Sequence, residues 1–161
     1  RNAYEHPEAL GPDRWCGMIG AWRRVRGPLV CIAAGTAMPI DAVDAAGTHL
    51  GGLIVPGHDL MIDSLLRRTS DIAPAAQLAP PAGSGMLGRN TAAAIELGAS
   101  HALAALALRS IDWVSRLVGT PPRVFLGGGD ATRIEPLLGV GVELASGLVL
   151  EGLAAIAEGD G

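Results

Sequence analysis

The chain has 161 residues, the length of one domain that can bury a substantial core. Hydrophobic residues make up 49% of the sequence but aromatic residues only 3%, so we expect an aliphatic core. A formal net charge of -4, with one small basic cluster at residues 23–26, argues against nucleic-acid binding. The sequence shows no signal peptide, and its longest uncharged apolar window, residues 97–108, is too short to cross a bilayer. Cys16 and Cys31 have apolar neighbours, which predicts buried thiols and, with the features above, a soluble cytoplasmic protein.

A first helix is predicted from Asp13, because Trp15, Met18, Ile19 and Trp22 share one helical face. Asp13 then lies at or next to the helix N-terminus, where the macrodipole and free N–H groups favour an ionised carboxylate. Two interpretations are open. Asp13 is a plain helix N-cap, or it is a general base on a rigid helix start, with Arg14 beside it to bind an anionic substrate.

The stretch that follows predicts two β-strands joined by a turn. The first strand is expected to run from Leu29 past Gly35-Thr36 to Val43, and the second from Thr48 to Val55. Gly35-Thr36 brings backbone N–H groups and a hydroxyl to one point, as a phosphate site requires. Gly51-Gly52 removes two side chains where another backbone or a ligand could approach closely.

The rest of the chain predicts alternating helices and strands. We expect a helix over residues 58–68, a Pro/Gly/Ala-rich loop over residues 69–89, and a long alanine-rich helix from Ala92 to Val118 capped by Asn90-Thr91. That long helix is apolar on most sides, which makes it the candidate subunit interface. A strand over residues 123–126 enters Gly127-Gly128-Gly129-Asp130 and a helix over residues 131–138, a corner whose bare backbone admits a base or phosphate. A strand near residues 140–144 and a helix over residues 147–157 complete an α/β pattern with a sheet covered by helices.

Seven short motifs occur in order along the chain. They are Tyr4, Leu10-Gly11-x-Asp13-Arg14-Trp15, Gly35-Thr36-Ala37, Gly51-Gly52 with Pro56-Gly57, Asn90-Thr91, Gly127-Gly128-Gly129-Asp130-Ala131, and Leu148-Val149-Leu150-Glu151-Gly152-Leu153. In order and spacing they resemble the C-terminal two thirds of a type III pantothenate kinase, the family that also includes the Bvg accessory factor proteins.

The resemblance implies a fold, a reaction and a set of site residues. The fold is a ribonuclease-H-like half of an actin-like ATPase, with a mixed sheet and flanking helices, and residues 1–161 form a single domain. The reaction is the ATP-dependent phosphorylation of pantothenate to 4′-phosphopantothenate, the first step of coenzyme A synthesis, by a homodimer that uses Mg²⁺. Asp13 matches the catalytic base. The expected pantothenate contacts are Tyr4, Gly11, Pro12, Asp13, Arg14 and Thr91, and the expected ATP contacts are Gly35, Thr36, Gly128 and Gly129.

Three departures from the family pattern bear on activity. The N-terminal domain with the phosphate loop is absent, so this piece alone is expected to have little or no kinase activity. Ala33 stands where the family has an aspartate that binds a monovalent cation, so we expect no such metal site here. Pro39 replaces a threonine, which removes a hydrogen-bond donor from the strand. These departures keep open a rival interpretation, a non-catalytic, dimeric binding or regulatory protein. A generic sugar kinase is a third possibility, but the Gly-x-Asp-Arg-Trp stretch is particular to the pantothenate kinases.

Overall fold

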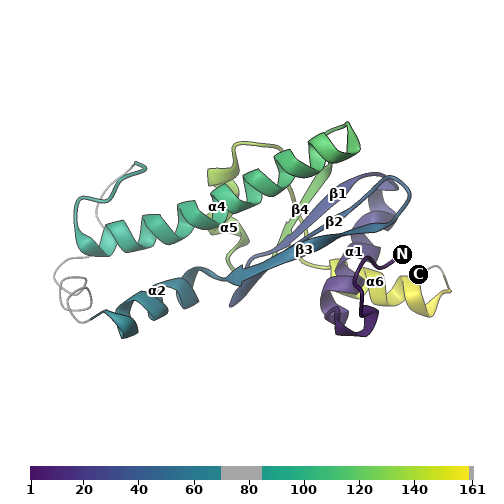
Figure 1. Ribbon diagram of the computed structural model, residues 1–161, viewed down its shortest axis with the longest axis horizontal. Coiled ribbons are helices and arrows are strands. Elements are labelled where there is room, and N and C mark those ends of the chain that lie inside the picture. Colours follow the sequence, from purple (N-terminus) through teal and green to yellow (C-terminus); the bar gives the residue numbers. More distant parts are fainter. Residues whose placement is uncertain (70–84, 160–161) are drawn as a thin grey trace.

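The computed structural model describes residues 1–69 and 85–159, so most of the predicted loop over residues 69–89 lies outside the described residues. Helices cover both faces of a five-stranded mixed sheet whose strand order is β3-β2-β1-β4-β5 (Figure 1). The strands are β1 (Leu29–Ala33), β2 (Ala37–Val43), β3 (His49–Pro56), β4 (Arg123–Gly127) and β5 (Glu143–Leu144). The helices are a 3-10 turn (Pro7–Ala9), α1 (Pro12–Val25), α2 (His58–Arg68), α4 (Thr91–Val118), α5 (Ala131–Leu138) and α6 (Leu148–Ala157). The predicted α/β class is confirmed.

The predicted two-stranded hairpin is wrong, because this stretch forms three strands. Gly35-Thr36 does not interrupt one long strand but lies in the turn between β1 and β2, which pair antiparallel with Leu29 opposite Val43. The Gly35 N–H donates to the Ala37 carbonyl at 3.2 Å and helps to close this turn. The apolar run was long enough for two strands, and periodicity alone could not show where the chain reverses. Thr36 therefore lies at one end of the sheet, in the turn between β1 and β2.

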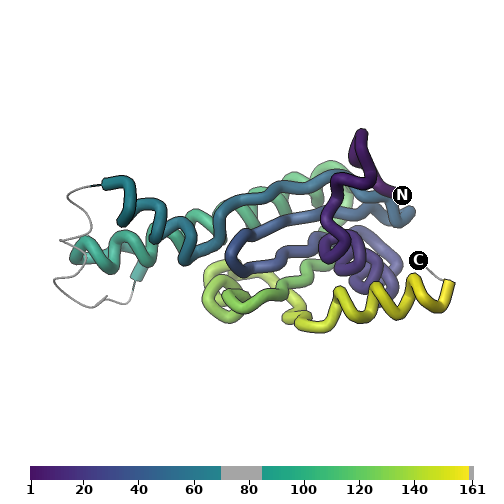
Figure 2. Tube along the Cα trace, turned by 90° about the horizontal axis from the view of Figure 1, so that it is seen from below, coloured from purple at the N-terminus to yellow at the C-terminus, as the bar shows by residue number. Residues whose placement is uncertain are grey.

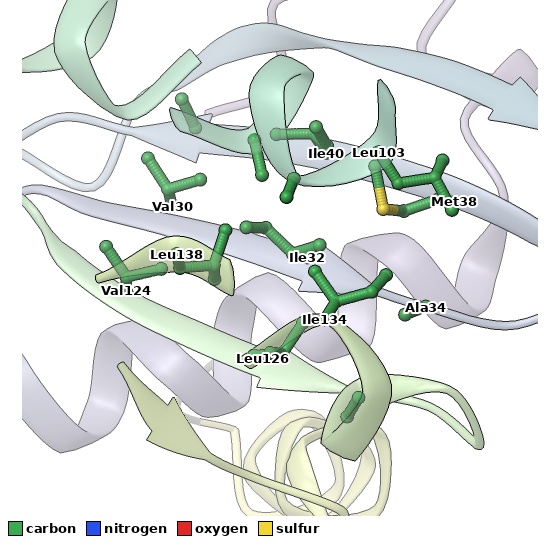
Figure 3. Close-up of a cluster of buried hydrophobic side chains, with 14 of the residues drawn as sticks. Val30, Ile32, Ala34, Met38, Ile40, Leu103, Val124, Leu126, Ile134 and Leu138 are labelled. Atoms are coloured by element: carbon green, nitrogen blue, oxygen red, sulfur yellow. The ribbon is translucent and has the colours of Figure 1, made fainter. Parts of the chain in front are cut away.

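Alternating side chains on the strands build a core on each face of the sheet. Val30 and Ile32 of β1 pack with α4 and α5, in the cluster shown in Figure 3. Leu29 of β1 belongs to the core on the opposite face, where it packs with Met18 of α1 and Phe125 of β4. The central strands of the sheet are therefore buried on both faces, as expected for a three-layer α/β arrangement, whereas most residues of the edge strand β3 are not buried.

Helices α1 and α6 lie side by side and are in backbone contact (Figure 2). A Cβ atom on Gly20 would overlap the Leu148 carbonyl oxygen, and one on Gly152 would overlap the Cys16 carbonyl oxygen. Arg24 of α1 also pairs with Glu151 of α6. This close packing fixes the start of α1, where Asp13 lies, relative to the start of α6.

Helix α4 begins as predicted. Asn90 is its N-cap, and its side-chain oxygen accepts a hydrogen bond from the Ala93 N–H at 2.8 Å. Its C-terminal part packs on the sheet, whereas its N-terminal part runs beyond the sheet alongside α2 (Figure 1). Buried His58, at the start of α2, joins the two helices through Glu96 of α4, with His58 Nε2 and Glu96 Oε2 3.2 Å apart.

The uncharged window of residues 97–108 is short, but α4 as a whole is long and apolar enough to cross a bilayer by length and composition alone. The uncharged window stops before the charged Arg109, whereas α4 continues to Val118. A core helix meets the same criterion, and α4 buries Leu103, Ala107 and Val114 against the sheet. The prediction that the protein binds no membrane stays a prediction.

Candidate functional site

A cavity of about 140 Å³ opens where β1 and β4 end, between the sheet and the first turns of α1 and α6. Among the residues that line it are Asp13 and Arg14 from α1, Ala33 from β1, and Gly127-Gly128 from the end of β4. The carboxyl ends of parallel strands are where open α/β sheets bind ligands. The cavity thus contains predicted residues from both the pantothenate and the ATP sets.

A larger cavity of about 440 Å³ lies against the C-terminal part of α4, lined by residues including Leu106 and Trp113. Gly51 and Gly52 line it, but none of the predicted pantothenate or ATP contacts does, and its surface is mostly apolar. Volume alone does not define a reactive site, which needs groups able to transfer protons or bind charge. We therefore assign the candidate site to the smaller cavity.

Asp13 is the second residue of α1, and its carboxylate is exposed at the cavity. The N-cap of α1 is Gly11 and not Asp13, so the plain N-cap interpretation of Asp13 is wrong. A Cβ atom on Gly11 would lie 2.8 Å from Asp13 Oδ1, so glycine at this position leaves room for the carboxylate. Pro12, at the first helical position, fixes the backbone there. Asp13 is thus a carboxylate on a rigid element that remains accessible to a ligand.

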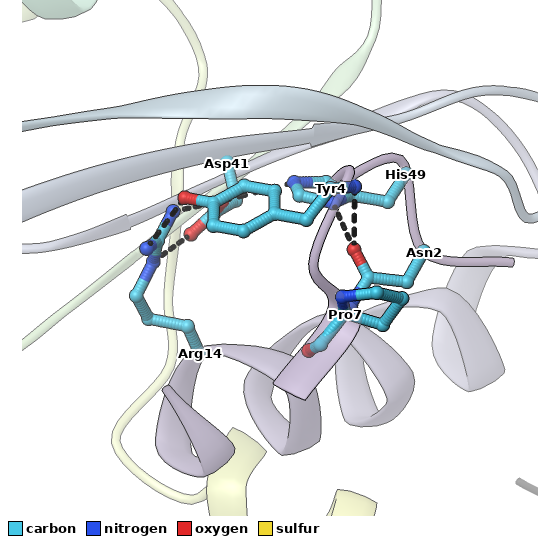
Figure 4. Close-up of polar contacts among 6 residues, drawn as sticks. All are labelled: Asn2, Tyr4, Pro7, Arg14, Asp41 and His49. Atoms are coloured by element: carbon cyan, nitrogen blue, oxygen red, sulfur yellow. Dashed lines mark hydrogen bonds and ion pairs between the residues drawn. The ribbon is translucent and has the colours of Figure 1, made fainter. Parts of the chain in front are cut away.

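Arg14 makes a bidentate ion pair with Asp41 of β2 (Figure 4). Arg14 Nε donates to Asp41 Oδ2 at 2.8 Å, and Arg14 Nη2 donates to Asp41 Oδ1 at 2.6 Å. Burial raises the pKa of Asp41, but hydrogen bonds from His49 and Arg14 outweigh it and leave that pKa below its ordinary value. The hydrogen bonds between Arg14 and Asp41 act on Arg14 in the opposite direction and raise its pKa above the ordinary value. Both groups are therefore charged over the whole physiological range.

Residues on either side of this ion pair complete a polar network (Figure 4). Arg14 Nη1 donates to the Tyr4 hydroxyl at 3.0 Å, and the Tyr4 backbone N–H donates to Asn2 Oδ1 at 3.0 Å. His49 Nε2 lies 3.1 Å from Asp41 Oδ1, and the His49 and Tyr4 rings are 5.7 Å apart. Tyr4 therefore reaches the site through Arg14 and does not line the cavity.

Sequence reasoning missed Asp41 and His49. The available signal was a carboxylate in the middle of the apolar strand Met-Pro-Ile-Asp-Ala-Val. A buried aspartate is rare unless it is paired. The residue type thus required a partner, although the sequence could not show that the partner was Arg14, 27 positions away.

The glycine corner after β4 is held against the end of β1. Ala34 N–H donates to the Gly127 carbonyl at 2.7 Å, and Asp130 N–H donates to the Ala34 carbonyl at 3.0 Å. Gly128 has a φ of +94°, and a Cβ atom there would overlap the Ala34 carbonyl oxygen. A Cβ atom on Gly129 would meet nothing within 4 Å. The corner thus presents bare backbone beside the cavity, a surface that fits a nucleotide.

Gly35 and Thr36 lie in the β1–β2 turn and do not line the cavity. The start of α2 holds this turn in place. Gly57 N–H donates to the Thr36 carbonyl at 2.8 Å, and a Cβ atom on Gly57 would overlap the Gly35 carbonyl oxygen. The exposed Thr36 side chain is therefore carried on a braced turn.

Thr91 lies in a different place from the other predicted residues. It lines an apolar cavity of about 420 Å³ formed by α2 and the first turns of α4, together with Met61, Leu65 and Gly98. The structure of one chain therefore does not bring Thr91 to Asp13.

The residues present do not fit a bound monovalent cation at the predicted position. Such a cation needs oxygen ligands, and Ala33 contributes no side-chain oxygen to the cavity. Asp41, which also lines the cavity, has both oxygens engaged by Arg14 and one by His49. Within residues 1–69 and 85–159, no group of three or more His, Cys, Asp or Glu side chains is placed to hold a metal ion.

Comparisons with known proteins identify the family. The sequence profile of type III pantothenate kinases matches residues 1–112. The type III pantothenate kinase of Polaromonas sp. (strain JS666) is 38% identical over 162 residues, which cover 97% of this chain and 61% of that protein. The one from Chromobacterium violaceum is 39% identical over 159 residues, which cover 98% of this chain and 65% of that protein. The chain thus spans less than two thirds of the length of these curated relatives.

Solved structures show the fold. A Campylobacter jejuni protein described as a Baf family transcriptional activator superposes with a TM-score of 0.53 at 23% identity, over 98% of this chain and 67% of that one. An archaeal actin homologue superposes with a TM-score of 0.51 at 13% identity, over 92% of this chain and 55% of that one. These likenesses confirm the predicted actin-like ATPase fold. With a profile match over most of its length and close relatives under one name, the chain belongs to the type III pantothenate kinase family.

Proposed function

We propose that the protein phosphorylates pantothenate with ATP to give 4′-phosphopantothenate, and that the cavity at Asp13 is its active site. The observation that supports this proposal is that Asp13, Arg14 and Gly128 line one cavity. A carboxylate, a guanidinium and bare backbone are the groups that an acidic alcohol and a nucleotide require.

Asp13 acts as general base in this proposal. Its carboxylate accepts the proton of the primary hydroxyl of pantothenate while that oxygen bonds to the γ-phosphorus of ATP. The bond between the γ-phosphorus and the β–γ bridging oxygen breaks, and ADP leaves. Arg14 binds the anionic substrate through N–H groups that Asp41 does not occupy.

The ATP contacts are proposed at the glycine corner, through Gly128 and Gly129, and at the β1–β2 turn, through Gly35 and Thr36. Mg²⁺ would be held mainly by the phosphates, as is usual for this ion. Because Ala33 offers no carboxylate, we propose that turnover does not depend on potassium or ammonium.

We further propose a cytoplasmic homodimer with α4 at its interface. Exposed small residues, Ala94, Gly98 and Ala102, border the apolar cavity at Thr91. Within one chain Thr91 does not share a cavity with Asp13, so its predicted contact with pantothenate would have to come from a second copy. The protein is proposed to act without nucleic acid or membrane partners.

A non-catalytic binding protein is the second candidate. It is favoured by Ala33, which has no side-chain oxygen where the family resemblance expects a cation-binding carboxylate. Such a protein would keep pantothenate binding at Arg14 without phosphoryl transfer.

An ATP-coupled assay on the longest natural form of the protein, with pantothenate and without added potassium, tests these alternatives. We expect turnover that Asp13→Asn abolishes and that Asp63→Asn leaves unchanged, because Asp63 lies on the exposed face of α2, paired with Arg67. Binding of pantothenate without turnover, measured by calorimetry, would favour the binding protein. Neither turnover nor binding would refute both candidates.

A further inference from the structure

Asp41 is a buried carboxylate without an assigned role in the proposed reaction. Its exposed fraction is 3%, and it lies in the middle of β2 on the sheet face that α1 covers. Both of its oxygens face partners: Oδ2 accepts from Arg14 Nε, and Oδ1 accepts from Arg14 Nη2 and His49 Nε2. Asp41 therefore has little capacity left to bind a ligand, and its effect on the cavity must pass through Arg14.

The hydrogen bonds of Arg14 fix its orientation. Three of the five guanidinium N–H groups donate to Asp41 and Tyr4. Within the described residues these bonds leave one N–H on Nη1 and one on Nη2, and Arg14 lines the cavity. Because a guanidinium is planar, fixing its Nε edge also fixes the direction of those two remaining donors.

Gly52 of β3 makes room for this arrangement. A Cβ atom on Gly52 would overlap Asp41 Oδ1, and it would lie 2.6 Å from the Ile40 carbonyl oxygen and 2.7 Å from Arg14 Nη2. The glycine pair in β3 thus has a specific use at its second position, since any side chain there would displace the ion pair.

Stability alone does not account for a buried ion pair. Removing two charges from water costs free energy that their attraction only approximately offsets, and apolar replacements of similar volume are often as stable. The pair is also neutral overall, so it adds little net charge to attract an anion. What it supplies is geometry, a guanidinium held in one orientation.

We propose that Asp41 is the positioning residue of this site, that it aims the two remaining N–H groups of Arg14 at the carboxylate-bearing substrate, and that Gly52 provides the space. This inference rests on the proposed function and adds to it two residues that determine how the substrate is bound. Arg14→Lys would then fail as a substitute, because an ammonium cannot be fixed along one edge by a carboxylate.

Steady-state kinetics of Asp41→Asn in the longest natural form test the inference. We expect the KM for pantothenate to rise by about a hundredfold, the loss associated with a reactive group misplaced by about 1 Å. The KM for ATP should stay within about twofold, since the glycine corner makes no contact with Asp41 among the hydrogen bonds of the described residues. Gly52→Ala, which keeps every charge, should raise the same KM, and Asp63→Asn should not.

A double-mutant cycle separates positioning from simple loss of a residue. If Asp41 acts through Arg14, Asp41→Asn in an Arg14→Lys background should change the KM for pantothenate by less than about twofold. Circular dichroism and the melting temperature identify a variant that fails to fold. If Asp41→Asn does not fold, Gly52→Ala alone and combined with Arg14→Lys decides in its place. Unchanged KM in folded Asp41→Asn, or additive effects in the cycle, overturns the inference while the kinase assignment stands. A wild-type protein that neither binds nor phosphorylates pantothenate overturns both.

Discussion

Gly20 of α1 and Leu148 of α6 meet backbone to backbone, because a Cβ atom on Gly20 would overlap the Leu148 carbonyl oxygen and lie 3.1 Å from the Gly152 nitrogen. The contact is between two helices, so no flexible side chain can move aside. We expect Gly20→Ala to lower the free energy of unfolding by about 1–3 kcal/mol, as overpacking usually does. Urea denaturation monitored by circular dichroism measures the change.

Gly17 provides the matched control on the same helix. A Cβ atom there would lie 3.9 Å from Val149 Cγ2, an ordinary contact. Gly17→Ala should therefore be neutral or stabilising by up to about 1 kcal/mol through helix propensity. Equal destabilisation by both substitutions would show that helix packing at Gly20 is not the cause.

The ion pair of Asp41 and Arg14 makes a prediction for the pH dependence of stability. The pKa of Asp41 in the folded protein lies below its ordinary value, so its contribution to stability is fully present above the unfolded pKa, about 4. That contribution is lost as the pH falls through the lower, folded pKa. Asp41→Asn should be destabilised by about 3 kcal/mol at pH 7.

The difference in free energy of unfolding between the wild type and Asp41→Asn should shrink as the pH falls below about 4, where Asp41 of the unfolded wild-type chain begins to gain its proton while folded Asp41 is still ionised. Chemical denaturation at a series of pH values between 7 and 3 measures both free energies on the same scale. A difference that stays constant across this range would contradict the role of the ionised carboxylate.

Cys31 is predicted to be unreactive at neutral pH. Burial raises the pKa of its thiol to about 12, with a smaller contribution from the negative charge of Asp41. At pH 8 the thiolate population should be about a thousandfold smaller than that of a free cysteine, and alkylation correspondingly slow. Mass spectrometry after timed iodoacetamide treatment tests this, with urea-unfolded protein as the fast control. Rapid labelling of folded protein at Cys31 at pH 8 would refute the prediction.

Ala33 makes a prediction for how the proposed kinase activity responds to monovalent cations. The wild-type protein should show the same rate in potassium and in tetramethylammonium salts, since Ala33 has no side-chain oxygen to bind a cation at this position. Ala33→Asp places a carboxylate there and should bring a rate that rises with potassium. Ala33→Asn, which has the same size without the charge, is the control. Strong potassium activation of the wild type would show that other oxygen ligands form the cation site.

Periodicity and capping signals predicted the helices well. The bounds of α2 were given by the apolar spacing over residues 58–68, and the start of α4 by Asn90, whose side chain caps the helix. The β1–β2 turn was missed because an apolar run of this length has no local signal for a reversal other than Gly35. Where a strand ends depends on the partner strand, which the local sequence does not contain.

The sequence predicted part of the geometry of the candidate site, whose role stays a prediction. Asp13 and Arg14 lie together at the cavity, as expected from adjacent residues at a helix start. Asp41 was missed because its importance comes from a partner in another element, and Thr91 is separated from Asp13 by the fold of a single chain. Motif resemblance identifies which residues a family uses, but it does not say which of them one chain brings together.

The contact of Gly57 with the β1–β2 turn limits how this protein can be redesigned. The Gly57 N–H donates to the Thr36 carbonyl, and the Gly35 carbonyl fills the space that any Cβ atom on Gly57 would need. A β1–β2 turn grafted from another protein would therefore have to be transplanted together with the first turn of α2. Residues 35, 36 and 57, although distant in sequence, form a single module for protein engineering.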